Sequence, residues 1–301
     1  MKVLCVCLSA TIQRTLCFDS FFVEQVNRTQ HWREDASGKA LNTARVLNQL
    51  EPGIATALCP VGTENSERFM NLVVSDANLS VHPIYVAGNT RECWTVLDAK
   101  RQTTTELVAD EIDKHHLAGA EAELELLSCV KEYMQTCDVL LFAGSRPAKW
   151  SVNLCARICT IAMQAGKLVV ADFRGVELQE TLKICTPHII KINEDEFCQT
   201  FGGLLLSEEE LTKAIQQKSK ELSAIVIVTR GKKDVIAADS GTLHRYPVET
   251  VDIVNTTACG DSFSAGLIYE YLSHKNIDAA IKKGIWCASR NAEHVVPGAI
   301  D

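Results

Sequence analysis

The chain alternates between two kinds of hydrophobic pattern. Short continuous apolar runs indicate buried strands, whereas apolar residues that recur every third or fourth position indicate helices with one buried face. The first pattern predicts core strands over residues 3–8, 54–61, 81–86, 138–142, 168–172, 188–192 and 224–229, then a hairpin over 234–246. The second predicts helices over residues 38–50, 65–77, 118–136, 151–165, 176–185, 195–201, 208–222, 260–273 and 277–294. Repeated strand and helix units predict an α/β fold with a mostly parallel sheet covered on both faces.

Two polar stretches rich in β-forming residues interrupt this alternation. The first is longer than an ordinary strand-to-helix connection and contains Phe18, Phe21, Phe22, Val23 and Val26. The second contains residues 92–98 and 103–108, which a polar turn separates into a predicted hairpin. We expect both to form one small satellite sheet. The predicted division is a satellite sheet of residues 11–35 and 87–108, and a core of residues 1–10, 36–86 and 109–301.

Composition narrows the class of protein. With 301 residues and 47% hydrophobic side chains, the chain can bury a full core. It carries 30 basic and 38 acidic residues, a net charge of −8, which disfavours nucleic acid or an anionic membrane as a partner. No run approaches the roughly 18 to 20 apolar residues of a membrane span. Any phosphate ligand must therefore be held by local donors.

The 13 cysteines are distributed through apolar segments and do not follow a disulfide framework. No Cys-x-x-Cys pair and no His-Glu-x-x-His motif occurs, so zinc and dithiol redox chemistry are unsupported. The short apolar run after Lys2 fits a first core strand better than a signal peptide. We therefore expect reduced thiols and a cytoplasmic protein.

Residues 255–266 combine a turn of small residues with the start of a strongly patterned helix. Backbone N–H groups at a helix N-terminus favour an anion. Asp261 lies at that position, and two interpretations are open: a general base beside a bound anion, or an acidic residue favoured in the first helical turn.

Ligands of parallel sheets bind beyond the carboxyl ends of the strands. This rule selects the loops at Gly144, Asp172, Asn193, Gly231 and Gly260. Two common nucleotide motifs are excluded. The pair Gly38-Lys39 lacks the flanking residues of a Walker loop, and no Gly-x-Gly-x-x-Gly follows the first strand.

Four segments, in order along the chain, resemble signatures of the ribokinase/PfkB family of carbohydrate kinases. Ala258-Cys-Gly-Asp261 is similar to Gly-Ala-Gly-Asp, and residues 36–47 are similar to the signature Gly-Gly-Lys-Gly-x-Asn-x-Ala. Residues 190–196 resemble the Asn-x-x-Glu segment, and residues 144–147 the Gly-Ser-Leu-Pro turn. The resemblance implies a ribokinase-like three-layer sandwich with a mostly parallel sheet and a small β lid.

The resemblance also implies an ATP-dependent transfer to a sugar hydroxyl. Asp261 would remove the hydroxyl proton, and the N–H groups of Ala258, Cys259 and Gly260 would stabilise charge on the transferred group. Mg²⁺ would be organised by Asn193 and Glu196 through water; Glu196 could instead be only a helix-start acid. The implied ATP contacts are Lys191, Asn193, Thr229, Gly231 and Asn291. A monovalent cation is a further candidate cofactor.

Residues 25–28, 89–91 and 103–106 resemble the branch of 1-phosphofructokinase and tagatose-6-phosphate kinase. The implied acceptor is a phosphorylated hexose such as fructose 1-phosphate, fructose 6-phosphate or tagatose 6-phosphate. Its existing phosphate would be held by Arg28, Lys39 and Arg91, although Arg28 could be only an exposed charge. The other implied sugar contacts are Gln13, Gly38, Asn42 and Glu106. Relatives also suggest a homodimer through the lid.

The chain departs from this pattern mainly on the sugar side. Gln13 stands where the branch has Asp, Thr95 where it has Lys, and Val108 where it has Asn; Ser37 and Ala40 replace signature glycines. An amide keeps hydrogen-bonding capacity but lacks the charge of a carboxylate. Two other functions therefore stay open: a kinase for an unphosphorylated sugar or nucleoside, and a catalytically idle nucleotide- or sugar-binding regulator. Cys259 is either a reactive thiol or a small filler residue.

Overall fold

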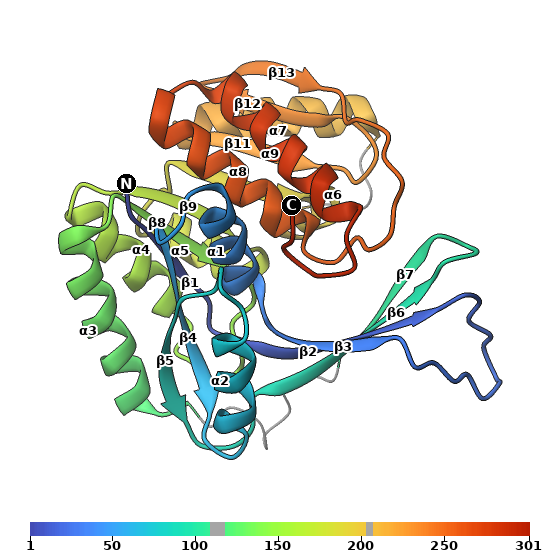
Figure 1. Ribbon diagram of the computed structural model, residues 1–301. Coiled ribbons are helices and arrows are strands. Elements are labelled where there is room, and N and C mark those ends of the chain that lie inside the picture. The colour runs from blue at the N-terminus through green and yellow to red at the C-terminus, as the bar shows by residue number, and fades with distance from the viewer. Residues whose placement is uncertain (109–117, 203–206) are drawn as a thin grey trace.

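The computed structural model describes residues 1–108, 118–202 and 207–301 (Figure 1). Within these residues, nine strands form one sheet in the order β13-β12-β11-β10-β9-β8-β1-β4-β5. Neighbouring strands pair in parallel from β5 to β11, and β12 and β13 continue the sheet antiparallel. The strands are β1 (Val3–Val6), β4 (Ala55–Gly62), β5 (Val81–Val86), β8 (Val139–Ala143), β9 (Leu168–Asp172), β10 (Ile189–Asn193), β11 (Ile225–Thr229), β12 (Val235–Asp239) and β13 (Thr242–Tyr246).

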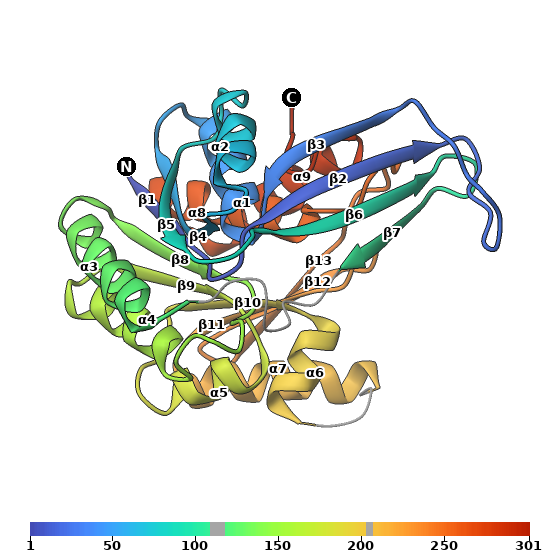
Figure 2. The ribbon, with the colours of Figure 1, turned by 90° about the horizontal axis from the view of Figure 1, so that it is seen from below.

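Helices cover both faces of this sheet, as Figure 2 shows. One face carries α1 (Lys39–Leu50), α2 (Ser66–Val74), α8 (Cys259–His274) and α9 (Ile277–Ala292). The other carries α3 (Ala120–Thr136), α4 (Leu154–Gln164), α5 (Gly175–Leu182), α6 (Glu194–Phe201) and α7 (Glu208–Leu222). The prediction of a mostly parallel sheet between two helical layers is confirmed.

The central strands are apolar on both sides because each faces a helical layer. In β1, Val3 and Cys5 belong to one hydrophobic cluster, whereas Leu4 and Val6 belong to the other. Successive side chains of a strand point to opposite faces, so a strand between two layers must be apolar throughout. This explains why the core strands appear in the sequence as continuous apolar runs.

A second sheet extends away from the core (Figures 1 and 2). This satellite sheet has the order β3-β2-β6-β7, with β2 (Thr11–Phe18), β3 (Trp32–Ser37), β6 (Arg91–Asp98) and β7 (Thr103–Val108). Strands β2 and β6 run parallel, and the two outer pairs run antiparallel. The guanidinium of Arg68 in α2 joins the sheet to the core through ion pairs of 2.6 Å with Glu34 and with Glu92.

The apolar residues of the first insertion differ from the expectation. Phe21, Phe22, Val23 and Val26 lie in the connection between β2 and β3, not in a strand. The side chains of Val23 and Val26 are 79% and 76% exposed. Local β propensity did not produce a strand there, since a strand also needs a hydrogen-bonded neighbour. The predicted boundary at residue 109 lies outside the described residues.

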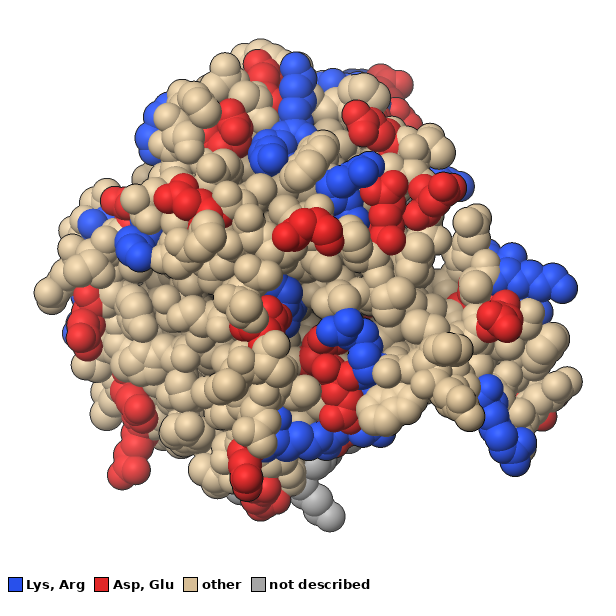
Figure 3. All heavy atoms as spheres, viewed as in Figure 1, with Lys and Arg blue, Asp and Glu red and all other residues tan. Residues whose placement is uncertain are grey.

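Surface charges are mixed. On the face shown in Figure 3, acidic and basic side chains are interspersed. Among the described residues, no helix is both long and apolar enough to cross a lipid bilayer. All 13 cysteines lie in the described part of the chain and are free thiols.

Candidate active site

A cavity of about 440 Å³ opens between the carboxyl ends of the core strands and the base of the satellite sheet. Every candidate residue from the sequence lines it except Arg28 and Asn291. One wall, called the sheet wall below, comes from β2, β6 and β7. The other, called the core wall, comes from α1, β10, β11 and α8. Segments that are far apart in the sequence thus meet at one site.

The turn that precedes α8, residues 255–260, is called the entry turn below. Ala258 adopts a left-handed conformation there, with φ 66°. The buried amide of Asn291 holds the turn from behind, donating to Thr257 O at 2.8 Å. Asn291 therefore supports the turn from outside the cavity. The Cys259 N–H, expected to face an anion, donates to Thr256 O at 3.3 Å.

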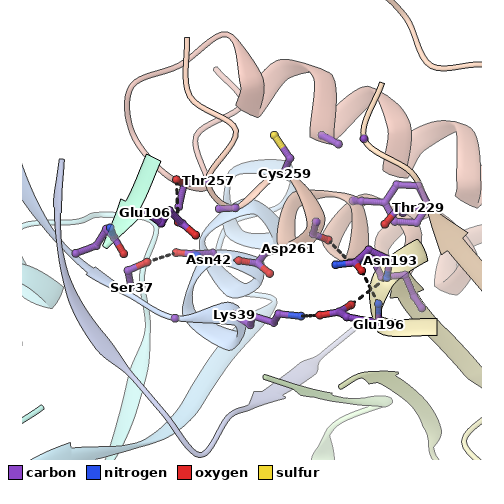
Figure 4. A pocket seen from close by; sticks show the side chains of 18 of the residues that line it. Ser37, Lys39, Asn42, Glu106, Asn193, Glu196, Thr229, Thr257, Cys259 and Asp261 are labelled. Atoms are coloured by element: carbon purple, nitrogen blue, oxygen red, sulfur yellow. Dashed lines mark hydrogen bonds and ion pairs between the residues drawn. The ribbon is translucent and has the colours of Figure 1, made fainter. Parts of the chain in front are cut away.

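Asp261 lies in the first turn of α8 and is 6% exposed. Its Oδ2 accepts a hydrogen bond of 2.8 Å from Asn42 Nδ2 (Figure 4). Burial raises the pKa of Asp261 to about 6, against the opposing effects of the Lys39 charge and the Asn42 hydrogen bond. A carboxylate with such a pKa is ionised at neutral pH and is a stronger base than an exposed one. Asp261 is therefore a first-turn acid that also lines the cavity, and its role as a base stays a prediction.

Asp172, at the end of β9, connects the two lysines of the core wall. Its Oδ1 lies 2.8 Å from Lys39 Nζ, and its Oδ2 lies 2.9 Å from Lys191 Nζ. Burial alone would raise the pKa of Asp172, but the charges of Lys191 and Lys39 outweigh burial and hold the pKa well below its ordinary value. Lys191 Nζ also donates to Gly260 O at 2.9 Å. Asp172 thus positions Lys191 against the entry turn.

Asn193 and Glu196 form a reciprocal cap at the start of α6. Asn193 Oδ1 accepts from the Glu196 N–H at 2.8 Å, and Glu196 Oε2 accepts from the Asn193 N–H at 2.9 Å. Glu196 Oε1 faces two cations, Arg174 Nη1 at 3.1 Å and Lys39 Nζ at 3.4 Å. Glu196 is therefore a helix-start acid and a cavity acid at once.

Two charged residues that contact the cavity wall, Asp172 and Arg174, were not predicted as site residues from the sequence. Asp172 was selected only as a loop position, although a carboxylate at the end of an apolar strand was the available signal. No sequence pattern predicts the ion pair between Arg174 and Glu196. That contact depends on how the loop after β9 packs beside α6.

On the sheet wall of the cavity, side-chain hydrogen bonds run from Gln13 to Glu106. Gln13 Nε2 donates to Thr95 Oγ1 at 2.7 Å, so the two departures from the family pattern contact each other. Thr95 Oγ1 lies 3.4 Å from Thr257 Oγ1, which donates to Glu106 Oε1 at 3.1 Å. Because Thr257 belongs to the entry turn, this chain joins the satellite sheet to the start of α8.

Comparison with known proteins identifies the family. Residues 2–299 match the profile of the pfkB family carbohydrate kinases. The chain belongs to the pfkB family of carbohydrate kinases. The sequence resemblance is therefore confirmed across nearly the whole chain.

Solved structures share the fold of this carbohydrate kinase. A Thermotoga maritima protein described as a possible 1-phosphofructokinase is 20% identical, with a TM-score of 0.88; the match covers 99% of this chain and 93% of that chain. Phosphofructokinase-2 from Escherichia coli in complex with fructose-6-phosphate is 19% identical, with a TM-score of 0.85 and coverage of 97% and 94%. The similarity confirms the ribokinase-like sandwich with its additional small sheet.

The core wall of this kinase fits a divalent cation that is only partly held by protein. Among the described residues, no cluster of three or more His, Cys, Asp or Glu side chains could hold a metal ion by itself. Mg²⁺ commonly binds through one or two carboxylates, water and substrate phosphates. Asn193 and Glu196 line the cavity and are the side chains that could hold such an ion through water.

The three predicted phosphate ligands of the kinase have different surroundings, and Lys39 and Arg91 line the cavity. Lys39 is held by Asp172 and Glu196 on the core wall, because its ammonium is surrounded by two buried carboxylates. Arg28 is exposed in the connection between β2 and β3 and does not line the cavity. Of the three predicted cations, Arg91 is the one in the cavity wall that comes from the satellite sheet.

Cys259 lines the cavity with its thiol mostly buried. Burial raises the pKa of Cys259 to about 11, more than the hydrogen bond from Asn291 lowers it. The thiol is therefore protonated at neutral pH and far less nucleophilic than a thiolate. This favours the interpretation of Cys259 as a small filler residue.

Proposed function

We propose that the protein transfers the γ-phosphate of ATP to a hydroxyl of a phosphorylated hexose, such as fructose 1-phosphate, fructose 6-phosphate or tagatose 6-phosphate. The observation that carries the proposal is Asp261, a buried carboxylate with a raised pKa at the N-terminus of α8. Family membership supports the reaction class. The names of the structural neighbours, one of them bound to fructose-6-phosphate, support the class of acceptor.

In the proposed reaction Asp261 accepts the proton of the attacking hydroxyl. Asn42 occupies Asp261 Oδ2, so Oδ1 is the oxygen that takes the proton. N–H groups at the start of α8 stabilise charge on the transferred phosphoryl group. Lys191, held at Gly260 O, adds a positive charge beside that turn. Phosphoryl transfer depends mainly on such positioning and charge stabilisation.

ATP is proposed to bind along the core wall. Lys191, Asn193, Thr229 and Gly231 line that side of the cavity together with apolar side chains of Val235, Val248 and Ile285. Asn193 and Glu196 would hold Mg²⁺ through water. When bound, Mg²⁺ neutralises phosphate charge during transfer. A monovalent cation is a further proposed cofactor, supported by the Escherichia coli phosphofructokinase-2 complex with potassium.

The sugar is proposed to bind against the satellite sheet, which would act as a lid. Gln13, Gly38, Asn42, Arg91 and Glu106 line this side, and Arg91 is the candidate for the existing phosphate. Arg28 does not line the cavity, so the structure of one subunit does not support Arg28 as a phosphate ligand. We further propose a homodimer through the satellite sheet, supported by exposed apolar side chains of its strands, Trp32 and Leu107, and of the connection between β2 and β3, Phe22, Val23 and Val26.

A second candidate acceptor is an unphosphorylated sugar or nucleoside. It is favoured by the Gln13–Thr95 pair, which removes both the carboxylate and the lysine of the family pattern from the sugar wall. A catalytically idle binding protein is the third alternative. The retained Asp261, Lys191 and Glu196 argue against an idle protein, because such a protein does not need a buried base beside the entry turn.

A coupled assay of ADP release across a panel of acceptors tests these alternatives. The panel contains fructose 1-phosphate, fructose 6-phosphate, tagatose 6-phosphate, the free sugars and nucleosides, with Mg²⁺ and ATP present. We expect turnover with a hexose phosphate. Turnover only with unphosphorylated acceptors would favour the second candidate, and ATP binding by calorimetry without ADP release would favour the idle protein.

The proposed setting is the cytoplasm. The 13 free cysteines support a reducing compartment, because several of them are partly accessible rather than fully buried.

A further inference from the structure

The amide of Asn42 has a single orientation that its neighbours dictate. Arg45 Nη1 lies 3.0 Å from Asn42 Oδ1, and the Ser37 hydroxyl lies 2.9 Å from the same oxygen. A guanidinium can only donate hydrogen bonds, so the atom that faces Arg45 must be the amide oxygen. The amide nitrogen therefore faces Asp261, as Figure 4 shows for the row Ser37, Asn42 and Asp261.

Arg45 cannot turn away from Asn42. It is 3% exposed, and its other donors are used by Ala36 O, Pro297 O and the Asp76 carboxylate. These partners come from β3, from the segment after α9 and from the segment after α2. Arg45 is thus a fixed donor, and Ser37 is the second donor that closes off the other side of the amide oxygen.

Ser37 is a departure from the family signature, which has glycine at this position. Glycine has no side chain and could not make this hydrogen bond. The serine is buried, at 2% exposure, and Gly38 follows it with φ 130°, which leads the chain into α1. Ser37 and Arg45, which both donate to Asn42 Oδ1, are called the clamp below. The replacement of glycine by serine therefore adds a donor to the clamp without blocking the start of the helix.

We propose that Ser37 and Arg45 are positioning residues, which hold the Asn42 amide so that its N–H group points at Asp261. The proposal rests on the proposed role of Asp261 as the base. Asn42 then occupies one oxygen of the carboxylate and leaves the other for the proton of the acceptor. An amide free to rotate would instead bring its oxygen toward the carboxylate, and the two would repel.

The charged groups around Asp261 also shift its pKa. Lys39 from α1 and Lys191 from β10 favour the ionised form, whereas Asp172 from β9 opposes it, as does burial. Cys259 on α8 is a further titratable neighbour, and it is protonated at neutral pH. A hydrogen bond to a carboxylate favours its ionised form, so the Asn42 N–H lowers the pKa of Asp261. Loss of the clamp raises that pKa further.

Ser37→Ala is the decisive variant, with two readouts. The first is the ¹³C NMR titration of the Asp261 carboxyl in the whole protein, assigned by comparison with Asp261→Asn; the second is the pH profile of kcat/KM. We expect both midpoints to rise by about 0.5 pH unit, since Ser37→Ala removes one of the two donors to the amide oxygen while Arg45 keeps the other. Ser37→Gly should behave in the same way, and Ser37→Thr should restore the wild-type midpoints.

A double-mutant cycle shows whether Ser37 acts through Asn42. In an Asn42→Ala background, Ser37→Ala should move the Asp261 midpoint no further. The matched control is Ser75→Ala, which removes an exposed hydroxyl bonded to Leu72 O at the end of α2 and should leave the midpoint unchanged.

The two readouts separate the inference from the proposed function. An unchanged NMR midpoint in folded Ser37→Ala, or a further shift in the Asn42→Ala background, overturns the inference. A shifted NMR midpoint without an acidic limb in the rate profile supports the inference and contradicts Asp261 as the base. Thermal melts confirm folding. If Ser37→Ala does not fold, Ser37→Gly carries the same test, because glycine also lacks the hydroxyl that bonds to Asn42.

Discussion

The two walls of the cavity stabilise their buried polar side chains in different ways. The core wall uses full charges: Asp172 neutralises Lys39 and Lys191, and Asp261 lies close to all three. The sheet wall joins Gln13, Thr95 and Thr257 through neutral hydrogen bonds before it ends on Glu106. In the proposed function, the core wall transfers the phosphoryl group and the sheet wall selects the acceptor.

This difference follows from where each wall is built. The charged residues lie at the end of β9, within β10 and at the starts of α1 and α8, where surrounding layers keep partners at fixed distances. Removal of one buried charge leaves its partner uncompensated, so such a set resists stepwise change. Gln13 and Thr95 are neighbours on paired strands and could be exchanged as a pair. If the sugar binds as proposed, the sheet wall is the part that can change without disturbing the charged residues of the core wall.

The largest expected effect is on the core wall. Asp261→Asn should lower kcat by about 10²- to 10⁴-fold on the true acceptor, since the general base is lost. ATP affinity, measured by calorimetry, should change little because the lysines remain. A kcat within a few-fold of wild type would show that the proton leaves by another route.

Asp172→Asn should destabilise the protein. Lys191 is nearly buried and would lose its charged partner, so we expect the free energy of unfolding to fall by about 3 to 5 kcal/mol in denaturant titrations. The stabilisation in the wild type is present above the unfolded pKa, ordinarily 3.8, and is lost as the pH falls below it, because the folded pKa is depressed. The control is Glu180→Gln, which breaks an exposed pair with Lys183 and should cost at most about 1 kcal/mol.

The sheet wall can be tested by restoring the family charges. Thr95 is fully buried, so Thr95→Lys alone should cost about 2 kcal/mol or more, and Gln13→Asp in addition should recover about 1 kcal/mol by pairing with the new lysine. A double-mutant cycle by denaturation measures the coupling. Thr105→Lys, at an exposed position of β7, is the control for an added lysine. Additive costs would show that Gln13 and Thr95 are not a unit.

The pH profile distinguishes a buried base from an exposed one. With a pKa of about 6, Asp261 must lose its proton before it can accept another, so kcat/KM should rise about tenfold per pH unit below 6 and level off above it. A midpoint near 4 would mean that the carboxyl is solvated during catalysis. The measurement needs only steady-state rates over a pH series.

The smallest effect concerns the entry turn. Ala258 has φ 66°, a region that costs a residue with a Cβ about 1 kcal/mol, so Ala258→Gly should raise the free energy of unfolding by about 0.5 to 1 kcal/mol. Ala214→Gly inside α7 should do the opposite and lower it by a similar amount. Equal losses in both variants would show that no strain is stored at Ala258.

Much of the fold could be predicted because its signals are local. Helix α7 coincides with the predicted residues 208–222, since Ser207 and Glu210 form a capping box that marks its start. Helix α4 begins at Leu154, three residues later than predicted, because residues 151–153 form a turn. The strands of the satellite sheet were found by composition, whereas Phe21 and Val23 misled the prediction because propensity says nothing of an available partner strand.

For this protein the sequence by itself determined the order of strands and helices, the small-residue turn before α8 and the presence of Asp261 at its start. These depend on periodicity and turn chemistry within a few residues. Only the tertiary structure decided that Asp172 joins two lysines, that Gln13 meets Thr95, and that Ser37 and Arg45 turn Asn42 toward Asp261. Asn42 and Asp261 are 219 residues apart, and a contact at that separation depends on how the layers pack.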